Sequence, residues 1–288
     1  MKTKITTVNY HLWKACNMRC KFCYATFQDF TDFKLPKGHL DCEQSKQLIS
    51  LLFNAGFEKI NFAGGEPTLC PWLPELVIYA KSIGFKTSIV TNGTMILKDE
   101  HYIKRFDGKL DIVGLSIDSV NDNTNLKSGR AIAGKKVLTC DDYKQVSQRV
   151  KDKKIHLKIN TVVSSTNSTE RITDFINAIR PDRWKILQML EVKGQNDEYG
   201  KEYSIEKSVF ENYIKINRFE LSPSIKVIEE SIEVITGSYI MINPEGCFFD
   251  DTKGTHTYSS NILEVGVSNA LCEVNSHDDK FFLREGVY

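Results

Sequence analysis

Three cysteines lie within eight residues near the start of the sequence, at Cys16, Cys20 and Cys23, with the spacing C-x3-C-x2-C. Thiolates this close together suit a soft metal, and proteins hold iron–sulfur clusters through cysteine sulfur. Three such ligands would bind three irons of a four-iron cluster and leave the fourth iron open to a small molecule. The spacing therefore predicts an iron–sulfur centre that can bind a further ligand.

Other roles for these thiols stay open on the spacing alone. A structural zinc ion needs four ligands, and the nearest further candidates, His11, His39 and Cys42, lack the spacing of a zinc finger. A disulfide would use two of the three cysteines, and three unrelated core cysteines are the other alternative. We interpret the remaining cysteines as packing or incidental thiols: Cys42, Cys70, Cys140, Cys247 and Cys272.

The elements that must position these cysteines alternate between strand-like and helix-like segments. We expect strands at residues 5–12, 59–63, 86–91, 110–117, 155–163 and 184–190. We expect helices at residues 41–55, 74–83, 98–106, 141–151, 169–179 and 205–219, with a loop-rich stretch at 120–140. This alternation predicts parallel βαβ units and an α/β fold.

Six such units predict a partial (βα)6 barrel over residues 1–221, with functional loops at the carboxyl ends of the strands. Residues 222–288 have a different pattern, with one strand expected at 238–243. We predict that they form a C-terminal extension that packs on the barrel and closes one end, within a single compact unit.

Two more loops follow predicted strands, so they should meet the cysteine loop at one end of the barrel. They are Gly64-Gly65-Glu66-Pro67 and Asn92-Gly93. By itself, Gly-Gly-Glu-Pro would be an ordinary turn with a helix-capping carboxylate. Its place directly after the second strand favours a functional role.

Alternation within the strands predicts a polar and basic barrel interior, because successive strand residues point to opposite faces. The polar residues spaced by two are Lys59 and Asn61, Ser116 and Asp118, Lys158 and Asn160, and Arg183 and Lys185. Taken singly, a lysine at a strand end is more often solvated. Four basic groups in one register require an anionic partner, since buried unpaired charge is costly. That partner is either a carboxylate such as Glu66 or Asp118, or a bound polyphosphate.

Two further residues also have ordinary structural interpretations. Arg130, in Ser128-Gly129-Arg130, could bind a phosphate through its planar guanidinium, but alone it would be interpreted as a surface loop arginine. Tyr239 lies in the strand predicted near the closing end, where a half-buried core tyrosine is the ordinary interpretation.

Composition argues against several classes of protein. Lys and Arg number 38 against 37 Asp and Glu, and a net charge of +1 argues against a general nucleic-acid-binding surface. We see no secretory signal, no amphipathic membrane anchor and no apolar run near the ~18 residues of a membrane span. We therefore expect a cytoplasmic protein without membrane or nucleic-acid partners, whose clustered cysteines bind metal.

The cysteine motif with the aromatic Tyr24 after it resembles the signature of radical S-adenosylmethionine (SAM) enzymes. A narrower resemblance, to the viperin family, covers residues 7 to about 285. It rests on several colinear segments: Val8-Asn9-Tyr10-His11, residues 58–67 and 88–93, Lys158-Ile159-Asn160, Arg183-Trp184-Lys185 and residues 262–267. Animal viperins carry a membrane-binding helix ahead of this core, so the sequence resembles a prokaryotic-type viperin.

This resemblance implies a [4Fe–4S] cluster, SAM and a reaction. A one-electron reductant of the flavodoxin or ferredoxin type would reduce the cluster, and SAM would be cleaved to methionine and a 5′-deoxyadenosyl radical. The radical would take the 4′ hydrogen of a ribonucleoside triphosphate. Loss of the 3′ hydroxyl as water, with a further electron and proton, would give the 3′-deoxy-3′,4′-didehydro nucleotide. That product terminates polymerase extension, which makes the family antiviral.

The resemblance also implies a role for each candidate residue. The cluster ligands are Cys16, Cys20 and Cys23, and the SAM contacts are Tyr24, Gly64, Gly65, Glu66, Asn92 and Ser116. The phosphate contacts are Lys59, Arg130, Lys158, Arg183 and Lys185, and the ribose or base contacts are Asn9 and Asn160. Tyr239 would donate hydrogen to the substrate radical or position it.

Some features stay open at this point. Residues 120–140 and 245–275 depart from the animal sequences, so the choice among CTP, UTP and GTP is not implied. We expect a monomer. One alternative is a radical SAM enzyme acting on a non-nucleotide substrate, which usually has further clustered cysteines. Another is a non-catalytic iron–sulfur or zinc protein, which would leave the basic interior unexplained.

Overall fold

A single curved sheet runs through the computed structural model, which describes residues 5–28, 35 and 38–283. Its strands are β1 (Thr7–Trp13), β2 (Lys59–Gly64), β3 (Lys86–Thr91), β4 (Ile112–Ser116), β5 (His156–Val163), β6 (Arg183–Gln188), β7 (Lys226–Glu230), β8 (Ile240–Ile242), β9 (Cys247–Asp250) and β10 (Thr257–Asn261). Their spatial order is β10-β9-β8-β1-β2-β3-β4-β5-β6-β7. Pairing is parallel from β8 through β1 to β7, and antiparallel from β8 to β10.

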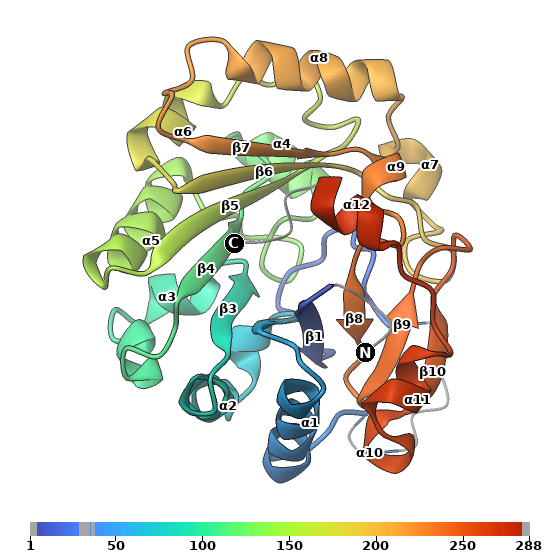
Figure 1. The fold of residues 1–288 in the computed structure, drawn as a ribbon. Coiled ribbons are helices and arrows are strands. Elements are labelled where there is room, and N and C mark those ends of the chain that lie inside the picture. The colour runs from blue at the N-terminus through green and yellow to red at the C-terminus, as the bar shows by residue number, and fades with distance from the viewer. Residues whose placement is uncertain (1–4, 29–34, 36–37, 284–288) are drawn as a thin grey trace.

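Helices connect and flank the strands of this sheet. They are α1 (Cys42–Asn54), α2 (Leu73–Ser82), α3 (Thr94–Lys98), α4 (Asp122–Ser128), α5 (Cys140–Asp152), α6 (Thr173–Ile179), α7 (Gly200–Tyr203), α8 (Lys207–Arg218), α9 (Ile232–Ile235), α10 (Ile262–Val265), α11 (Val267–Leu271) and α12 (Asp278–Leu283), with 3₁₀ helices η1 (Pro67–Leu69) and η2 (Tyr102–Phe106). Figure 1 shows α1, α2, α3, α5, α6 and α8 outside the curve, so the concave face forms the barrel interior. The predicted α/β partial barrel is confirmed.

The helix α1 begins and ends at residues that the sequence marks. The Asp41 side chain accepts from the Gln44 N–H at 2.8 Å, and the Gln44 side chain accepts from the Asp41 N–H at 3.0 Å. This reciprocal pair satisfies N–H groups that the first helical turn leaves unpaired. Gly56 follows the helix with a φ of +94°, a conformation that glycine adopts at little cost.

Two stretches within residues 1–221 differ from the prediction, and residues 222–288, where the pattern predicts one strand, contain β7, β8, β9 and β10. Residues 120–140, predicted as loop-rich, contain the helix α4, where the Asn121 side chain accepts from the N–H groups of Asn123 and Thr124. Residues 98–106, predicted as one helix, divide into the end of α3 and η2, because Asp99 is extended with φ −121° and ψ 106°. A polar helix as short as α4 lacks the apolar periodicity by which helices are recognised in a sequence.

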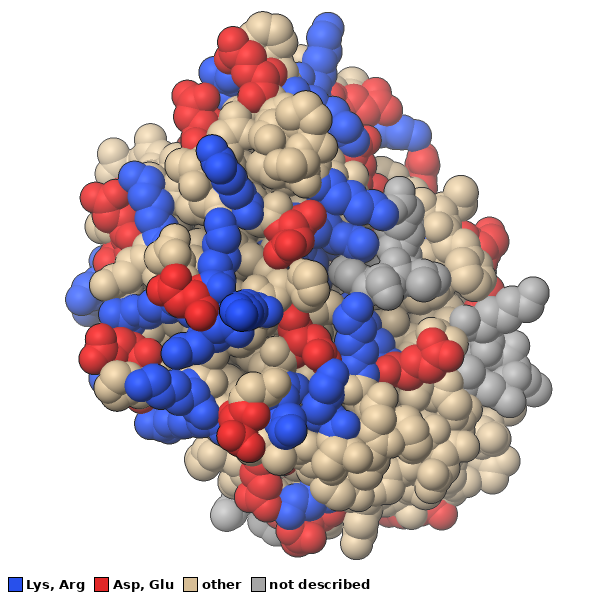
Figure 2. Space-filling model, turned by 60° about the vertical axis from the view of Figure 1, so that its left-hand side comes forward, with Lys and Arg blue, Asp and Glu red and all other residues tan. Residues whose placement is uncertain are grey.

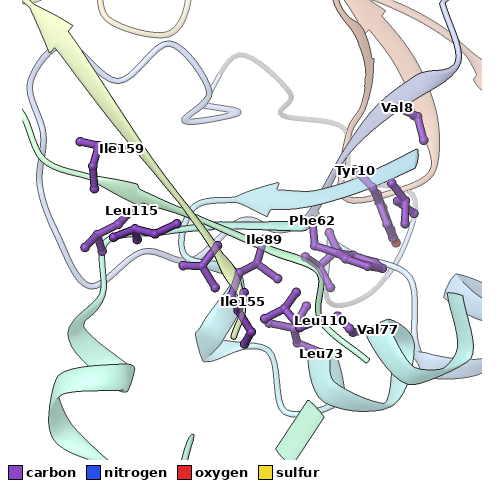
Figure 3. Packing of buried hydrophobic residues seen from close by; sticks show 14 of the residues in the cluster. Val8, Tyr10, Phe62, Leu73, Val77, Ile89, Leu110, Leu115, Ile155 and Ile159 are labelled. Atoms are coloured by element: carbon purple, nitrogen blue, oxygen red, sulfur yellow. The ribbon is translucent and has the colours of Figure 1, made fainter. Parts of the chain in front are cut away.

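The apolar core lies between the sheet and the outer helices. The residues that alternate with the polar interior positions are completely buried: Ile60, Phe62, Ile117, Leu157, Ile159, Trp184 and Ile186. They belong to one continuous cluster with residues of the helices, and Figure 3 shows Phe62 and Ile89 of the sheet beside Leu73 and Val77 of α2. The predicted orientation of these strands, apolar toward the helices and polar toward the interior, is confirmed.

The chain after residue 221 extends the sheet on both sides. β7 pairs with β6 and forms one edge, whereas β8 pairs with β1 and continues into β9 and β10 at the other edge. The extension therefore supplies strands on both sides of the barrel opening and does more than close one end. A domain boundary at residue 221 stays a prediction, since the same sheet continues across it.

Charges of both signs occur on the surface. Figure 2 shows Lys and Arg interspersed with Asp and Glu over one face, in keeping with the net charge of +1. Among the described residues, no helix has the length and apolar character needed to cross a bilayer. All eight cysteines are free thiols.

Candidate active site

The cysteine loop leaves β1 and is held against the segment after α4. The Arg19 N–H donates to the Gly129 carbonyl at 3.1 Å, and the Lys21 N–H donates to the Ser128 carbonyl at 3.0 Å. Gly129 has a φ of +75°, and a Cβ there would lie 2.0 Å from the Arg19 carbonyl oxygen. This position requires glycine, and the segment supports the cysteine loop through its backbone.

Gly64 and Gly65 allow the end of β2 to approach the same loop. The Gly65 N–H donates to the Trp13 carbonyl at 2.6 Å. A Cβ on Gly64 would lie 2.3 Å from the Trp13 carbonyl oxygen, and one on Gly65 would lie 2.3 Å from the Lys14 carbonyl oxygen. The close approach of two backbones thus explains both glycines, and their contact with SAM stays a prediction.

We expect Gly65→Ala to displace the cysteine loop and lower the iron content of the protein. The clash is with backbone, which cannot rotate away, and overpacking of this kind costs about 1–3 kcal/mol. Iron per chain after anaerobic reconstitution, together with the thermal unfolding midpoint, measures the effect. Gly108→Ala is the control for iron content: its φ of +66° strains an alanine, but a Cβ there meets nothing within 4 Å. Equal iron content in the two variants would contradict this account.

Glu66 joins the ends of β2 and β3. Its buried carboxylate accepts from the Thr68 hydroxyl at 2.5 Å, the Thr91 hydroxyl at 2.7 Å and the Asn92 N–H at 2.7 Å. Burial raises the pKa of this carboxyl, and the hydrogen bonds oppose that rise. Oε1 accepts three of the hydrogen bonds and Oε2 accepts the one from the Asn92 N–H, so the carboxylate supports the loop, and its predicted contact with SAM stays a prediction.

Asn92 connects this network to the first cysteine. Its Nδ2 donates to Asn17 Oδ1 at 2.8 Å, and its Oδ1 accepts from the Thr94 hydroxyl at 2.7 Å. Asn17 follows Cys16 directly and donates to the Thr94 hydroxyl at 2.9 Å. Asn92 therefore helps to hold the cysteine loop through these hydrogen bonds. Its contact with SAM stays a prediction. Nothing in the sequence marks Asn17 or Thr94, because their hydrogen bonds join segments that are far apart in the chain.

The three thiols suit a multi-iron cluster better than one zinc ion. Among the described residues, the three sulfurs do not all lie within 4.8 Å of one another, whereas ligands of one tetrahedral zinc with bonds of about 2.3 Å would lie about 3.8 Å apart. Burial raises the pKa of Cys16 to about 11 and that of Cys20 to about 12, and it also raises the pKa of Cys23. Ligation requires thiolates, so metal binding would release these protons.

Arg130 lies beside the cysteines and is paired with Asp118. Its Nε donates to Asp118 Oδ2 at 2.6 Å, and Nη2 contacts the same oxygen. The guanidinium lies over the Phe22 ring, 5.5 Å from the ring centroid. Burial raises the pKa of the three thiols, and the positive charge of Arg130 opposes that rise. Phosphate binding by Arg130 stays a prediction, and a phosphate would have to share the guanidinium with Asp118.

The basic residues of the interior lie on the concave face of the sheet. Register places Asn9 opposite Asn61, Lys158 opposite Arg183, and Asn160 opposite both Ser116 and Lys185. Lys59, Lys158 and Lys185 are 6%, 7% and 5% exposed, and Arg183 is half-buried. Buried ammonium groups need counter-charges nearby, so this face can bind an anion. The roles of these residues toward a ligand stay predictions.

Polar atoms without a hydrogen-bond partner lie on the same face. Among the described residues, these buried atoms include Asn61 Oδ1, Ser88 Oγ and Asn160 Oδ1. A Cβ on Gly114 would lie 3.0 Å from Lys158 Cε and 3.1 Å from Asn160 Nδ2, so this glycine makes room for both side chains. Buried polar atoms are nearly always satisfied, which makes Ser88 a candidate ligand contact that sequence reasoning missed.

Lys185 and Tyr239 meet at Glu230, a residue that sequence reasoning also missed. Lys185 Nζ donates to Glu230 Oε1 at 2.5 Å and to the Tyr239 hydroxyl at 2.9 Å. The Tyr239 hydroxyl donates to Glu230 Oε2 at 2.5 Å. Glu230 lies at the end of β7 beside the exposed Glu229, and nothing in the sequence distinguishes the buried glutamate from its neighbour.

Tyr24 directly follows the last cysteine of the loop, Cys23. It is 38% exposed, yet burial of its hydroxyl raises its pKa, and the negative charges of Cys23, Asp251 and Glu230 raise it further. Its ring contacts the buried His11 edge to face, with centroids 6.1 Å apart. The side chain is thus partly accessible beside the cysteine loop, and its predicted contact with SAM stays a prediction.

Comparison with known proteins identifies the family. The model of the radical SAM superfamily matches residues 10–179. S-adenosylmethionine-dependent nucleotide dehydratases of Lacinutrix mariniflava and Flammeovirga pacifica are each 44% identical over 99% of this chain, which spans 59% of the first relative and 96% of the second. This chain belongs to the viperin family of radical SAM proteins. A third member, S-adenosylmethionine-dependent nucleotide dehydratase RSAD2 of Danio rerio, is 35% identical over 99% of this chain and 77% of its own length.

Solved structures with this fold include other radical SAM enzymes. Streptococcus suis SuiB bound to S-adenosylmethionine has a TM-score of 0.63 at 16% identity, over 85% of this chain and 59% of SuiB. Native anSMEcpe with bound AdoMet has a TM-score of 0.68 at 17% identity, over 92% of this chain and 79% of that protein. At such identity the likeness confirms the fold alone. The radical SAM family implies a [4Fe–4S] cluster and SAM, and the set of three thiols on one loop fits that cluster.

Proposed function

We propose that this protein removes water from a ribonucleoside triphosphate (CTP, UTP or GTP) and forms the 3′-deoxy-3′,4′-didehydro nucleotide, a chain terminator with an antiviral role. The observation that carries the proposal is the barrel interior, where three lysines no more than 7% exposed share one face. A triphosphate is an anion that three such lysines can bind together through charge-assisted hydrogen bonds. The relatives, named nucleotide dehydratases, support the same class of reaction.

In this proposal the chain holds its cofactors with the cysteine loop. Cys16, Cys20 and Cys23 would ligate the cluster, and Tyr24 would line the SAM site with the ends of β2, β3 and β4. When bound, the cluster and SAM supply the radical that takes the 4′ hydrogen. The hydrogen bonds of Glu66 and Asn92 would fix the loop. A fixed loop would serve the reaction, because radical chemistry depends on close and constant placement of the reacting atoms.

The nucleotide would lie along the concave face. Lys59, Lys158, Arg183 and Lys185 would bind its phosphates through charge-assisted hydrogen bonds. Asn9 and Asn160 would hold the ribose, whose hydroxyls can donate to the buried Asn160 Oδ1. Tyr239 would donate hydrogen to the substrate radical or position it. Overall, SAM and the nucleotide take up two electrons and one proton and yield methionine, 5′-deoxyadenosine, water and the didehydro nucleotide.

The remaining partners are inferred from the chemistry and the composition. The reaction needs a one-electron reductant of the flavodoxin or ferredoxin type. Eight free thiols suit a reducing cytoplasm, and a net charge of +1 suits a small-molecule substrate better than a nucleic acid. We infer that the protein works as a monomer in the cytoplasm without a membrane partner.

An anaerobic assay tests the proposed reaction. The protein is reconstituted with iron and sulfide, given SAM and dithionite, and incubated separately with CTP, UTP, GTP and ATP. We expect one of CTP, UTP and GTP to stimulate 5′-deoxyadenosine formation and to yield a nucleotide lighter by one water, both seen by mass spectrometry. SAM cleavage that no nucleotide stimulates would instead support a different substrate, and an intact cluster without any cleavage would support a non-catalytic protein.

A further inference from the structure

Glu230 joins two sides of the barrel that are far apart in the sheet. It ends β7, whereas Tyr239 directly precedes β8. β7 and β8 are the two ends of the parallel part of the sheet. The hydrogen bond of 2.5 Å between Tyr239 and Glu230 therefore spans the opening of the barrel.

The Glu230 carboxylate has one oxygen for each of two residues that the proposed function uses. Oε1 accepts from Lys185 at 2.5 Å, and Oε2 accepts from Tyr239 at 2.5 Å. The side chains of Lys185 and Glu230 are 6% and 0% exposed. A buried ion pair adds little stability compared with apolar side chains of the same size, so stability alone does not account for this arrangement.

We propose that Glu230 is a positioning residue that fixes the Tyr239 hydroxyl and competes with the substrate phosphates for Lys185. The proposal rests on the proposed function. A phosphate that approaches Lys185 draws the ammonium away from Oε1, while Oε2 keeps its bond to Tyr239. Substrate binding and the placement of Tyr239 are thereby coupled through one carboxylate.

Glu230→Gln separates the two effects. The amide puts an acceptor oxygen at one of the two carboxylate positions and a donor NH2 at the other. The charged Lys185 is the stronger donor and takes the oxygen, so the NH2 faces the Tyr239 hydroxyl and the hydrogen bond that Oε2 accepts from Tyr239 is lost. Loss of the competing charge should tighten the binding of CTP about threefold to tenfold. Calorimetry on the reconstituted protein without SAM or reductant measures this affinity. The amount of nucleotide product per SAM cleaved should fall at least about tenfold, because Tyr239 is no longer fixed.

Three further variants give the expected pattern. Glu230→Asp keeps the charge but shortens the side chain. The amount of nucleotide product per SAM cleaved should therefore fall, while CTP affinity stays near that of the wild type. Tyr239→Phe should also lower the amount of nucleotide product per SAM cleaved, and it should not bind CTP more tightly than the wild type does. Glu229→Gln is the matched control on the same strand, where the exposed Glu229 pairs with Arg218 at 2.5 Å, and both measurements should match the wild type.

Two results would overturn the inference. One is a Glu230→Gln variant whose CTP affinity and whose amount of nucleotide product per SAM cleaved both equal those of the wild type. The other is a joint loss of affinity, iron content and unfolding midpoint in that variant, which would make Glu230 a structural residue. Failure of the proposed function is distinguishable, because the wild type would then form no nucleotide product while calorimetry would still measure the competition for Lys185.

Discussion

Replacement of Cys16, Cys20 or Cys23 by alanine should abolish both the cluster and SAM cleavage. Each thiol is one of three on a loop fixed by Gly65, Glu66 and Asn92, and two ligands do not retain a four-iron cluster. The rate of 5′-deoxyadenosine formation should fall at least about a thousandfold, because the cofactors carry the difficult chemistry. Iron and sulfide analysis, the visible absorption of the cluster and mass spectrometry measure these losses.

The control for this series is Cys272→Ala, which removes an exposed thiol outside the loop. It should keep the iron content and activity of the wild type. Thermal unfolding of the iron-free proteins checks that each variant folds. An intact four-iron cluster in all three loop variants would remove the basis of the cofactor assignment.

Lys158→Ala should weaken nucleotide binding about tenfold to a hundredfold, the loss expected for one charge-assisted hydrogen bond of about 1.5–3 kcal/mol. Lys158 is 7% exposed on the concave face, and Gly114 leaves room for its side chain. The cysteine loop makes no use of this lysine in the proposed site, so the iron content should not change. Calorimetry with CTP measures the nucleotide affinity, and iron analysis of the same preparation measures the iron content.

Lys153→Ala is the matched control, since this lysine is exposed just after α5. It removes the same charge from the same part of the chain without reaching the barrel interior. CTP affinity should equal that of the wild type. If Lys158→Ala binds CTP as tightly as Lys153→Ala does, the phosphate role of Lys158 is wrong.

The parts of this site that repeat regularly along the sequence were predictable. Polar residues at every second position placed Lys158 and Asn160 on one face, and the buried Leu157 and Ile159 on the other confirm it. Alternation with a period of two is a local signal. A shift of the strand register by one residue would have moved every side chain of the strand to the opposite face of the sheet. The three cysteines were predictable for the same reason, because their spacing is contained in one loop.

The parts that depend on distant contacts were not predictable. β7 forms an edge of the sheet with two adjacent glutamates, and their sequence does not say which one is buried. Asn17 acts through Thr94 and Asn92, more than 70 residues away. The Ser88 hydroxyl is distinguished by its lack of a hydrogen-bond partner among the described residues, a property of the packed structure. Each of these features appears only once segments that are far apart in the chain pack together.

A nucleotide deuterated at the 4′ carbon tests the central claim most directly. The reconstituted protein is incubated with SAM, dithionite and the 4′-deuterated form of the triphosphate that stimulates SAM cleavage. We expect 5′-deoxyadenosine that carries one deuterium, and a dehydrated nucleotide that has lost it. Unlabelled 5′-deoxyadenosine, formed while the nucleotide keeps its deuterium, would contradict the proposed placement of the nucleotide and the reaction derived from it.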